Sequence, residues 1–144
     1  MDRLIVLIIL TLVAVGVAFV LQRRRPDPPS APSYRAPTQL DRDDFADTAG
    51  RLLIVLFSSA TCDSCPGAWA VIEAITARLV PVVAAERYDV QDAPELHGRY
   101  RIDGVPTTLV VDAEGVVVQA FFGPLTAEQL ADALTEAGAD QPGG

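Results

Sequence analysis

The stretch of sequence that decides the fold is residues 52–65, LLIVLFSSATCDSC. Residues 52–57 form an unbroken apolar run, as expected for a central strand that is covered on both faces. Cys62 and Cys65 follow in a short loop. Beyond them, apolar side chains recur at helical spacing until Pro81 stops the pattern, at Ala68, Ile72, Ile75 and Leu79. The stretch therefore predicts a buried strand, a cysteine-bearing loop and a helix in direct succession.

The residues on either side of this stretch complete an α/β pattern. A short first helix, residues 42–48, is expected with Asp41 as its cap and Gly50 at its end. A capping box formed by Thr126 and Gln129 predicts a last helix that runs to Gly138. Between them we expect strands at residues 82–90, 107–111 and 116–121, a helix at 94–100, and a hairpin turn at 112–115. This order, with one hairpin near the end, predicts an α/β sheet.

The N-terminal segment has the composition of a membrane anchor. Residues 4–21 are eighteen residues without a charge, about 27 Å long as a helix, which is enough to cross a bilayer core. A buried globular helix and a cleaved signal peptide are the alternatives. The apolar run is long and the basic region before it is weak, so we expect an uncleaved transmembrane anchor. Residues 22–40 hold five Pro and predict a semi-extended linker to a domain at residues 41–144.

The arginines beside this segment indicate its orientation. Arg23, Arg24 and Arg25 follow it directly, whereas only Arg3 precedes it. Cytoplasmic flanks carry the excess of Lys and Arg, so the sequence favours a cytoplasmic domain.

The charge of the chain excludes one class of partner. Residues 1–40 carry five Arg and two Asp, a net charge of +3, whereas residues 41–144 carry six Arg and seventeen Asp or Glu, a net charge of −11. An acidic domain repels phosphate backbones, so no nucleic-acid partner is expected. Two Cys and one His are also too few for a self-sufficient structural zinc site, so no metal is expected.

The placement of the cysteines points to redox chemistry. A helix N-terminus stabilises a thiolate on the first Cys, and two intervening residues let the second reach it to close a disulfide. Taken alone, a Cys-x-x-Cys pair is equally consistent with half of a metal site or with two buried thiols. Its position after a buried strand and at a helix start favours a redox pair.

In order and spacing, residues 38–138 resemble thioredoxin. The most specific part of the resemblance is Gly104-Val105-Pro106-Thr107. The resemblance implies a thioredoxin-like fold, a central mixed sheet flanked by helices, with a cis bond between Val105 and Pro106 facing the cysteines. It implies that Val105, Pro106 and Thr61 contact an extended protein substrate. It also implies that Cys62 is the nucleophile and Cys65 the resolving residue, with no cofactor other than their disulfide.

The sequence departs from the usual thioredoxin pattern at four places. Leu56 stands where thioredoxins usually carry a buried Asp, and Thr61 stands in place of a Trp before the first Cys. Asp63-Ser64 replaces Gly-Pro between the cysteines, and Ala70 replaces a Pro in the following helix. With these changes the chain is more similar to membrane-anchored, specialised thioredoxin-like proteins, which commonly work outside the cytoplasm, than to the general reductant.

Asp63 is expected to tune the reactive cysteine. A carboxylate beside Cys62 disfavours a thiolate there and so raises the pKa of that thiol. The reduction potential of the cysteine pair is then expected to be more reducing. The leading hypothesis is a membrane-tethered thiol–disulfide oxidoreductase acting on protein thiols and disulfides. The alternative, motivated by Leu56, is a non-catalytic thioredoxin-fold binding module of a membrane complex, whose cysteines hold a metal or are inert.

Three other features are expected to be structural. His97 is predicted to be an exposed or half-buried helix residue, and Trp69 to pack one turn after Cys65. Four acidic residues are predicted to lie on a solvated helix face: Asp41, Asp43, Asp44 and Asp47.

Overall fold

A computed structural model describes residues 1, 3, 13, 15, 34–46 and 51–139 of the chain. The chain divides into two units, residues 1–33 and residues 34–144, and the fold reported below is that of the second unit. The expected anchor at residues 4–21 lies outside the described residues except for Val13 and Val15, and so does the linker as far as residue 33. Among the residues that are described, no helix is both long enough and apolar enough to cross a bilayer.

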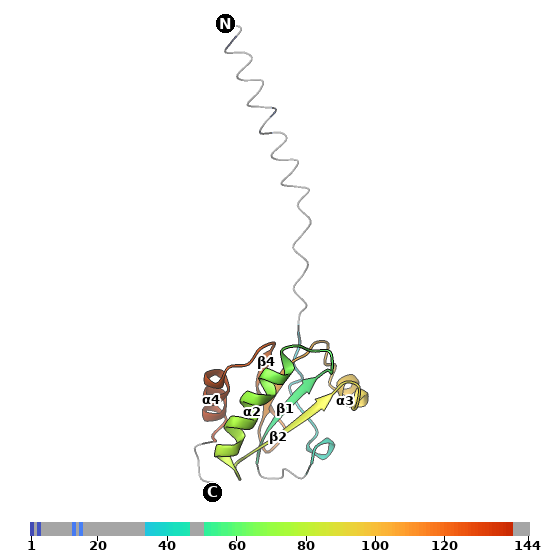
Figure 1. The fold of residues 1–144 in the computed structure, drawn as a ribbon, viewed down its shortest axis with the longest axis vertical. Coiled ribbons are helices and arrows are strands. Elements are labelled where there is room, and N and C mark those ends of the chain that lie inside the picture. The colour runs from blue at the N-terminus through green and yellow to red at the C-terminus, as the bar shows by residue number, and fades with distance from the viewer. Residues whose placement is uncertain (2, 4–12, 14, 16–33, 47–50, 140–144) are drawn as a thin grey trace. The chain divides into compact units, whose positions relative to one another are not determined.

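The domain is built on a mixed sheet of four strands in the order β2-β1-β3-β4, shown in Figure 1. The strands are β1 (Leu52–Ser58), β2 (Val83–Asp89), β3 (Thr107–Val111) and β4 (Val117–Phe122). β1 pairs with β2 in parallel and with β3 antiparallel, and β3 pairs antiparallel with β4. The sequence-based prediction of an α/β sheet that ends in one hairpin is therefore confirmed, and the strand read from residues 52–57 is central.

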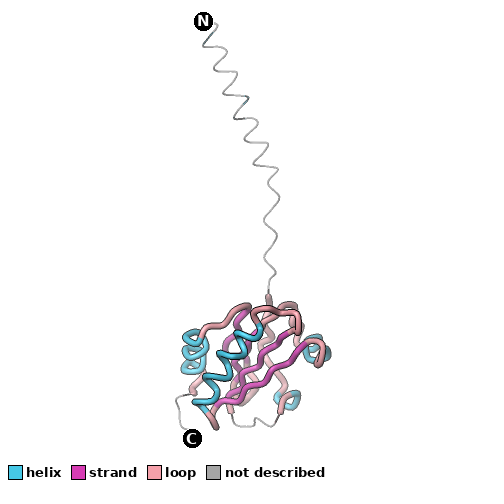
Figure 2. The backbone as a smooth tube through the Cα atoms, in the orientation of Figure 1, coloured by secondary structure: helices cyan, strands magenta, loops and turns pink. Residues whose placement is uncertain are grey.

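Helices cover both faces of the sheet, as Figure 2 shows. On one face, α2 (Cys65–Leu79) and α4 (Ala127–Glu136) enclose a core with Ile54, Leu56 and Val110. On the other, α3 (Pro94–Arg99) and residues 40–45 enclose a core that includes Phe57. Successive β1 side chains enter opposite cores, so all its residues after Leu52 are buried. The predicted capping box is present at the start of α4.

The predicted first helix is much shorter than expected. Instead of residues 42–48, only η1 (Arg42–Asp44), a single 3-10 turn, forms, and Asp41 caps it by accepting from the Asp43 N–H at 3.1 Å. The helix ends because Phe45 adopts an extended backbone and packs its ring against Tyr88 and Tyr100. Burial of an aromatic ring thus outweighs continuation of a polar helix. Residues 47–50 lie outside the described part of the chain.

The acidic cluster beside this turn is not simply a solvated face. Arg99 forms ion pairs of 3.1 Å with both Asp41 and Asp44. The Tyr100 hydroxyl donates to Asp44 and accepts from the Asp41 N–H at 3.0 Å. Burial, followed by the hydrogen bond to Asp44, raises the pKa of Tyr100 above its ordinary value. These contacts join η1 to α3, while Asp43 remains exposed as predicted.

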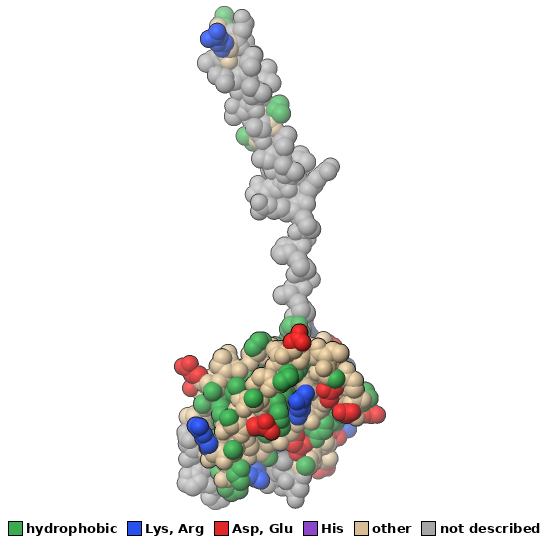
Figure 3. Space-filling model, viewed as in Figure 1, with side chains coloured by type: hydrophobic (Ala, Val, Ile, Leu, Met, Phe, Trp, Pro, Cys, Tyr) green, Lys and Arg blue, Asp and Glu red, His purple; other side chains and the backbone are tan. Residues whose placement is uncertain are grey.

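Figure 3 shows acidic side chains spread over one face of the domain, with few basic side chains between them. This distribution agrees with the excess of Asp and Glu in residues 41–144.

Residues 34–40, which the sequence pattern places in the linker, pack against the domain. The Leu40 N–H donates to the Gly115 carbonyl at 2.8 Å, and the Val117 N–H donates to the Thr38 carbonyl at 3.0 Å. The Leu40 side chain is buried. Gly115 adopts a φ of +85°, and a Cβ atom placed there would lie 2.3 Å from the Leu40 carbonyl oxygen. The contact between this segment and the hairpin therefore requires a glycine.

We expect Gly115→Ala to lower the free energy of unfolding by about 3 kcal/mol, because it combines left-handed strain with a backbone clash. Gly138→Ala is the matched control, since Gly138 has a φ of +87° but open space around its Cα. The control should lose only about 1 kcal/mol. Urea unfolding of the full-length variants measures both values, and equal losses would contradict the role given to the Leu40 contact.

Candidate functional site

The predicted site residues gather at one edge of the sheet, where β1, β2 and β4 end and β3 begins. Strand pairing sets this arrangement, because Phe57 lies opposite Thr107, and Thr107 lies opposite Phe122. Ser58 lies opposite Asp89 at the end of the parallel neighbour. We call this the carboxyl edge. It brings the cysteine loop after β1 and the Val105-Pro106 segment before β3 to the same end of the domain.

The two cysteines form a disulfide, with an S–S distance of 2.05 Å and a Cα–Cα distance of 5.5 Å. The prediction that this pair closes a disulfide is confirmed. Cys65 is the first residue of α2 and is fully buried, whereas Cys62 precedes the helix and is half-buried. Cys62 is therefore the sulfur that an approaching molecule reaches first.

The loop that carries Cys62 is held by a residue from the end of β2. Gln91 accepts a hydrogen bond from the Ala60 N–H and donates one to the Ser59 hydroxyl, both at 3.2 Å. The Ser59 hydroxyl also contacts the Thr61 hydroxyl at 3.1 Å, and the Ser59 carbonyl accepts from the Cys62 N–H at 3.1 Å. Sequence reasoning missed Gln91. The signal was available, because residues that follow two adjacent parallel strands meet at one edge.

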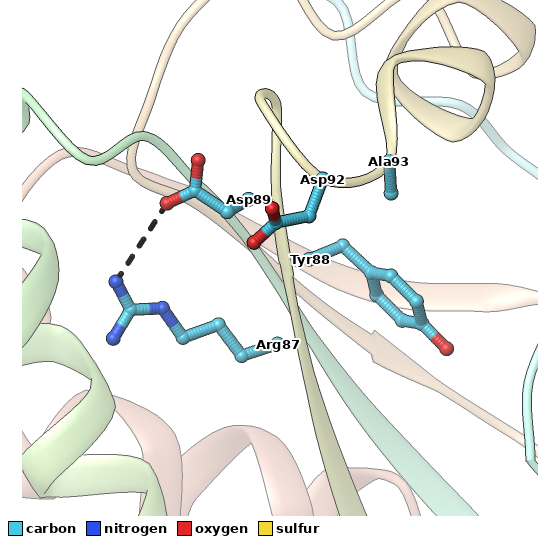
Figure 4. A pocket seen from close by; sticks show the side chains of 5 residues that line it. All are labelled: Arg87, Tyr88, Asp89, Asp92 and Ala93. Atoms are coloured by element: carbon cyan, nitrogen blue, oxygen red, sulfur yellow. Dashed lines mark ion pairs between the residues drawn. The ribbon is translucent and has the colours of Figure 1, made fainter.

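At the end of β2 an open cavity of about 340 Å³ is lined by residues of this strand and of the turn after it, shown in Figure 4. In this view Arg87 and Asp89 face one another, with 3.9 Å between the guanidinium and the carboxylate. The Arg87 Nε also donates to the Ser58 hydroxyl at 3.0 Å. The Arg87 charge is therefore directed to partners at the ends of β1 and β2.

The two residues between the cysteines differ in their contacts. The Ser64 hydroxyl lies 3.9 Å from the Cys62 sulfur, at the long end of the range for a hydrogen bond to sulfur. Asp63 is exposed, and within residues 34–46 and 51–139 its carboxylate has no hydrogen-bond or ion-pair partner. The acidic charge beside Cys62 is thus balanced by solvent and not by a nearby arginine.

The interior behind the cysteines is largely apolar. Leu56, at the position where thioredoxins usually carry an Asp, is fully buried in the core beneath α2. Its partner on β3 is Thr108, whose buried hydroxyl has no hydrogen-bond partner among the described residues. Its partner on β2 is Arg87. Position 56 therefore provides no carboxylate that could exchange a proton with Cys65.

The Val105–Pro106 peptide bond is cis, as the resemblance implied. Pro106 is buried, and its carbonyl accepts from the Gly123 N–H at 2.9 Å. Val105 is 37% exposed, and neither its N–H nor its carbonyl has a partner in the part of the chain that the structure describes. The backbone of Val105 is consequently free to pair with another chain. A second cis bond, Val80–Pro81, follows α2 and was not predicted.

His97 was predicted to be exposed or half-buried, and this is wrong. It is only 6% exposed and packs edge-on against the Phe57 ring. Its Nε2 lies 3.1 Å from the Tyr88 carbonyl, so this nitrogen carries the proton and donates it. Among the described residues, no three His, Cys, Asp or Glu side chains gather where they could hold a metal. Trp69 packs against the core beneath α2, as predicted.

Burial also affects the pKa of Tyr88, whose carbonyl contacts His97. Desolvation, together with the hydrogen bond that Tyr88 donates to Glu86, raises the pKa of Tyr88 far above its ordinary value. The Tyr88 hydroxyl therefore stays protonated near neutral pH and donates to Glu86.

Solved structures with this fold include thioredoxins. The domain is similar to chloroplastic thioredoxin z, with 25% identity, a TM-score of 0.55, and coverage of 62% of this chain and 80% of that one. It shares its fold with the germline-specific thioredoxin Deadhead of Drosophila melanogaster, at 17% identity, a TM-score of 0.55, and coverage of 62% and 83%. A malarial protein also has this fold, at 9% identity, a TM-score of 0.56, and coverage of 60% and 97%.

Among curated protein sequences, none matches the chain. The sequence pattern of the thioredoxin family, however, matches residues 38–136, which is more than half of its length. That match spans the cysteine loop, the cis-proline and all four strands of the sheet. The chain therefore belongs to the thioredoxin family.

Proposed function

We propose that the protein is a thiol–disulfide oxidoreductase that acts on protein substrates through Cys62 and Cys65. The observation that carries the proposal is the Cys62–Cys65 disulfide at the start of α2 in a thioredoxin-family chain. The free backbone of Val105, at the same edge of the sheet, supports an extended polypeptide as the substrate. Pro106 and Thr61 complete the proposed contact surface.

The difference in burial between Cys62 and Cys65 supports their proposed roles as attacking and resolving residue. In the reduced pair, the Cys62 thiolate attacks one sulfur of a substrate disulfide. A bond forms between Cys62 and that sulfur while the substrate S–S bond breaks, and the released substrate thiolate takes a proton from water. The buried Cys65 thiolate then attacks the Cys62 sulfur. The Cys62–Cys65 disulfide forms, the mixed disulfide breaks, and the second substrate thiol is released.

Two electrons and two protons pass in this way from the cysteine pair to the substrate. A protein dithiol restores the reduced pair by the same two exchanges in reverse. In the opposite direction, the disulfide present in the structure accepts two electrons from a substrate dithiol. The relative reduction potentials of the pair and its partners set the direction.

We expect the full-length protein to accelerate the reduction of insulin by dithiothreitol, and Cys62→Ser to abolish the acceleration. Cys65→Ser should instead accumulate a mixed disulfide with a protein substrate, since the resolving thiolate is missing. Turbidity measures the first effect, and non-reducing electrophoresis the second. Wild type no faster than Cys62→Ser would refute the oxidoreductase and favour the non-catalytic binding module, for which the buried Leu56 is the motivating feature.

Asp63 is proposed to set the redox poise of the pair. The exposed carboxylate opposes a thiolate on Cys62, so Asp63→Asn should lower the pKa of the Cys62 thiol. Stabilising the reduced form should make the potential more oxidising. Thiolate absorbance and a glutathione-buffer titration measure the two effects.

Asp132→Asn is the control for Asp63→Asn, because it removes the same charge from an exposed position on α4. It should leave both quantities unchanged. Equal effects of the two variants would show that the net charge of the domain acts on the pair, and not Asp63.

We further propose that residues 4–21 anchor the protein in a membrane and that the domain faces the cytoplasm. The uncharged length of the segment and the Arg23–Arg25 cluster support this arrangement. In a chain without its native cysteines, a membrane-impermeant maleimide should label Ser33→Cys only after intact cells are permeabilised. Labelling in intact cells would place the domain outside the cytoplasm.

A further inference from the structure

Tyr34 lies at the carboxyl edge although it belongs to the segment that precedes the predicted domain. Its ring stacks on Phe122, with 5.4 Å between centroids and 21° between planes. It also lies against Gly104, where an added Cβ atom would come within 2.2 Å of the Tyr34 Cε1 atom. A glycine at position 104 therefore allows the ring to lie directly beside the cis-proline segment.

The tyrosine forms one wall of a small pocket. The pocket has a volume of about 120 Å³, and its other walls are residues 104–107, Phe122 and Gly123. A volume of this order can hold a group of about the size of a benzene ring, and this pocket is open to solvent. None of the lining side chains carries a charge at neutral pH. The pocket therefore suits one uncharged apolar side chain and disfavours a charged one.

Three large apolar side chains are exposed around this pocket: Val105 at 37%, Phe122 at 40% and Tyr34 at 46%. The Val105 backbone, which has no partner among the described residues, borders the same pocket. In an extended peptide paired with Val105, side chains close to the paired residue would reach the pocket walls. A patch of this kind beside an unpaired backbone is typical of a binding surface.

From this arrangement we infer that Tyr34 is a specificity-determining residue. It forms the aromatic wall of the substrate groove and selects polypeptides with a large apolar side chain next to the reacting cysteine. The inference rests on the proposed oxidoreductase function and adds its substrate class. Tyr34 is held in place by the pairing of Thr38 and Leu40 with the hairpin, so the groove includes a segment outside the sheet.

The test uses the reduced full-length protein and two synthetic peptide disulfides, one with Leu and the other with Ser on both sides of the cysteine. Each exchange rate is divided by the rate with glutathione disulfide, which reports the chemistry of Cys62 without a large apolar side chain beside the reacting sulfur. Wild type should prefer the Leu peptide about threefold to tenfold, the range that one aromatic contact supplies. In Tyr34→Ala this ratio should fall about twofold or more, while Val105 and Phe122 still line the pocket.

Two further variants identify the ring as the cause. Tyr34→Phe should keep the preference, because the hydroxyl of Tyr34 makes no hydrogen bond with any described residue. Gly104→Ala should lose the preference, because its Cβ displaces the ring. Val82→Ala is the control, since it removes an exposed apolar side chain directly before β2, at the opposite end of the sheet from Tyr34, and should leave the ratio unchanged.

The possible failures are distinguishable. No exchange by wild type with any disulfide would refute the proposed function. Exchange with equal rates for the two peptides, or an unchanged ratio in Tyr34→Ala, would refute the role of Tyr34 and leave the function in place. A Tyr34→Ala protein that reacts faster with both peptides would show that the ring covers the groove and does not bind substrate, which also overturns the inference.

Discussion

The pairing of β1 with a strand on each side is the constraint on which the rest of the structure depends. Its side chains alternate between two cores, so all but the first are buried. The parallel partner places Asp89 and Gln91 at the end of β1, and the antiparallel partner places Pro106 there. Every group of the candidate site reaches its position through this register. A change that shifted the register by one residue would exchange the two cores and dismantle the site.

Where the signal is local, the sequence predicts the fold well. The apolar run of β1, the helical spacing in α2, the hairpin turn and the capping box of α4 each depend on residues close in the chain. The length of the first helix was overestimated. The cap and the acidic residues favour a helix, but Phe45 packs in the core against Tyr88 and Tyr100, which are distant in sequence. Propensity yields to burial when the partner of an aromatic ring lies elsewhere in the chain.

The candidate site likewise has parts that a local motif predicts and parts that depend on residues distant in the sequence. The cysteine pair is a short motif that the sequence displays directly, whereas the cis-proline was expected from the resemblance to thioredoxin. The hydrogen bonds from Gln91 to the cysteine loop depend on strand register. The Arg87–Ser58 contact depends on which face of β2 a side chain occupies. His97 was misjudged because a short polar helix gives no sign that one of its faces packs on Phe57. The position of Tyr34 could not be predicted from the sequence. A proline-rich composition suggests an extended linker and does not indicate which surface the linker contacts.

The docking of residues 34–40 also has a consequence for access. Because the segment begins at Tyr34 beside the cis-proline, the polypeptide enters the domain at the same edge as the exposed sulfur. Access to the surface around Val105 therefore depends on residues 34–40. A change in this segment that moved Tyr34 would cover or uncover the Val105 backbone while the sheet and the Cys62–Cys65 disulfide stay in place.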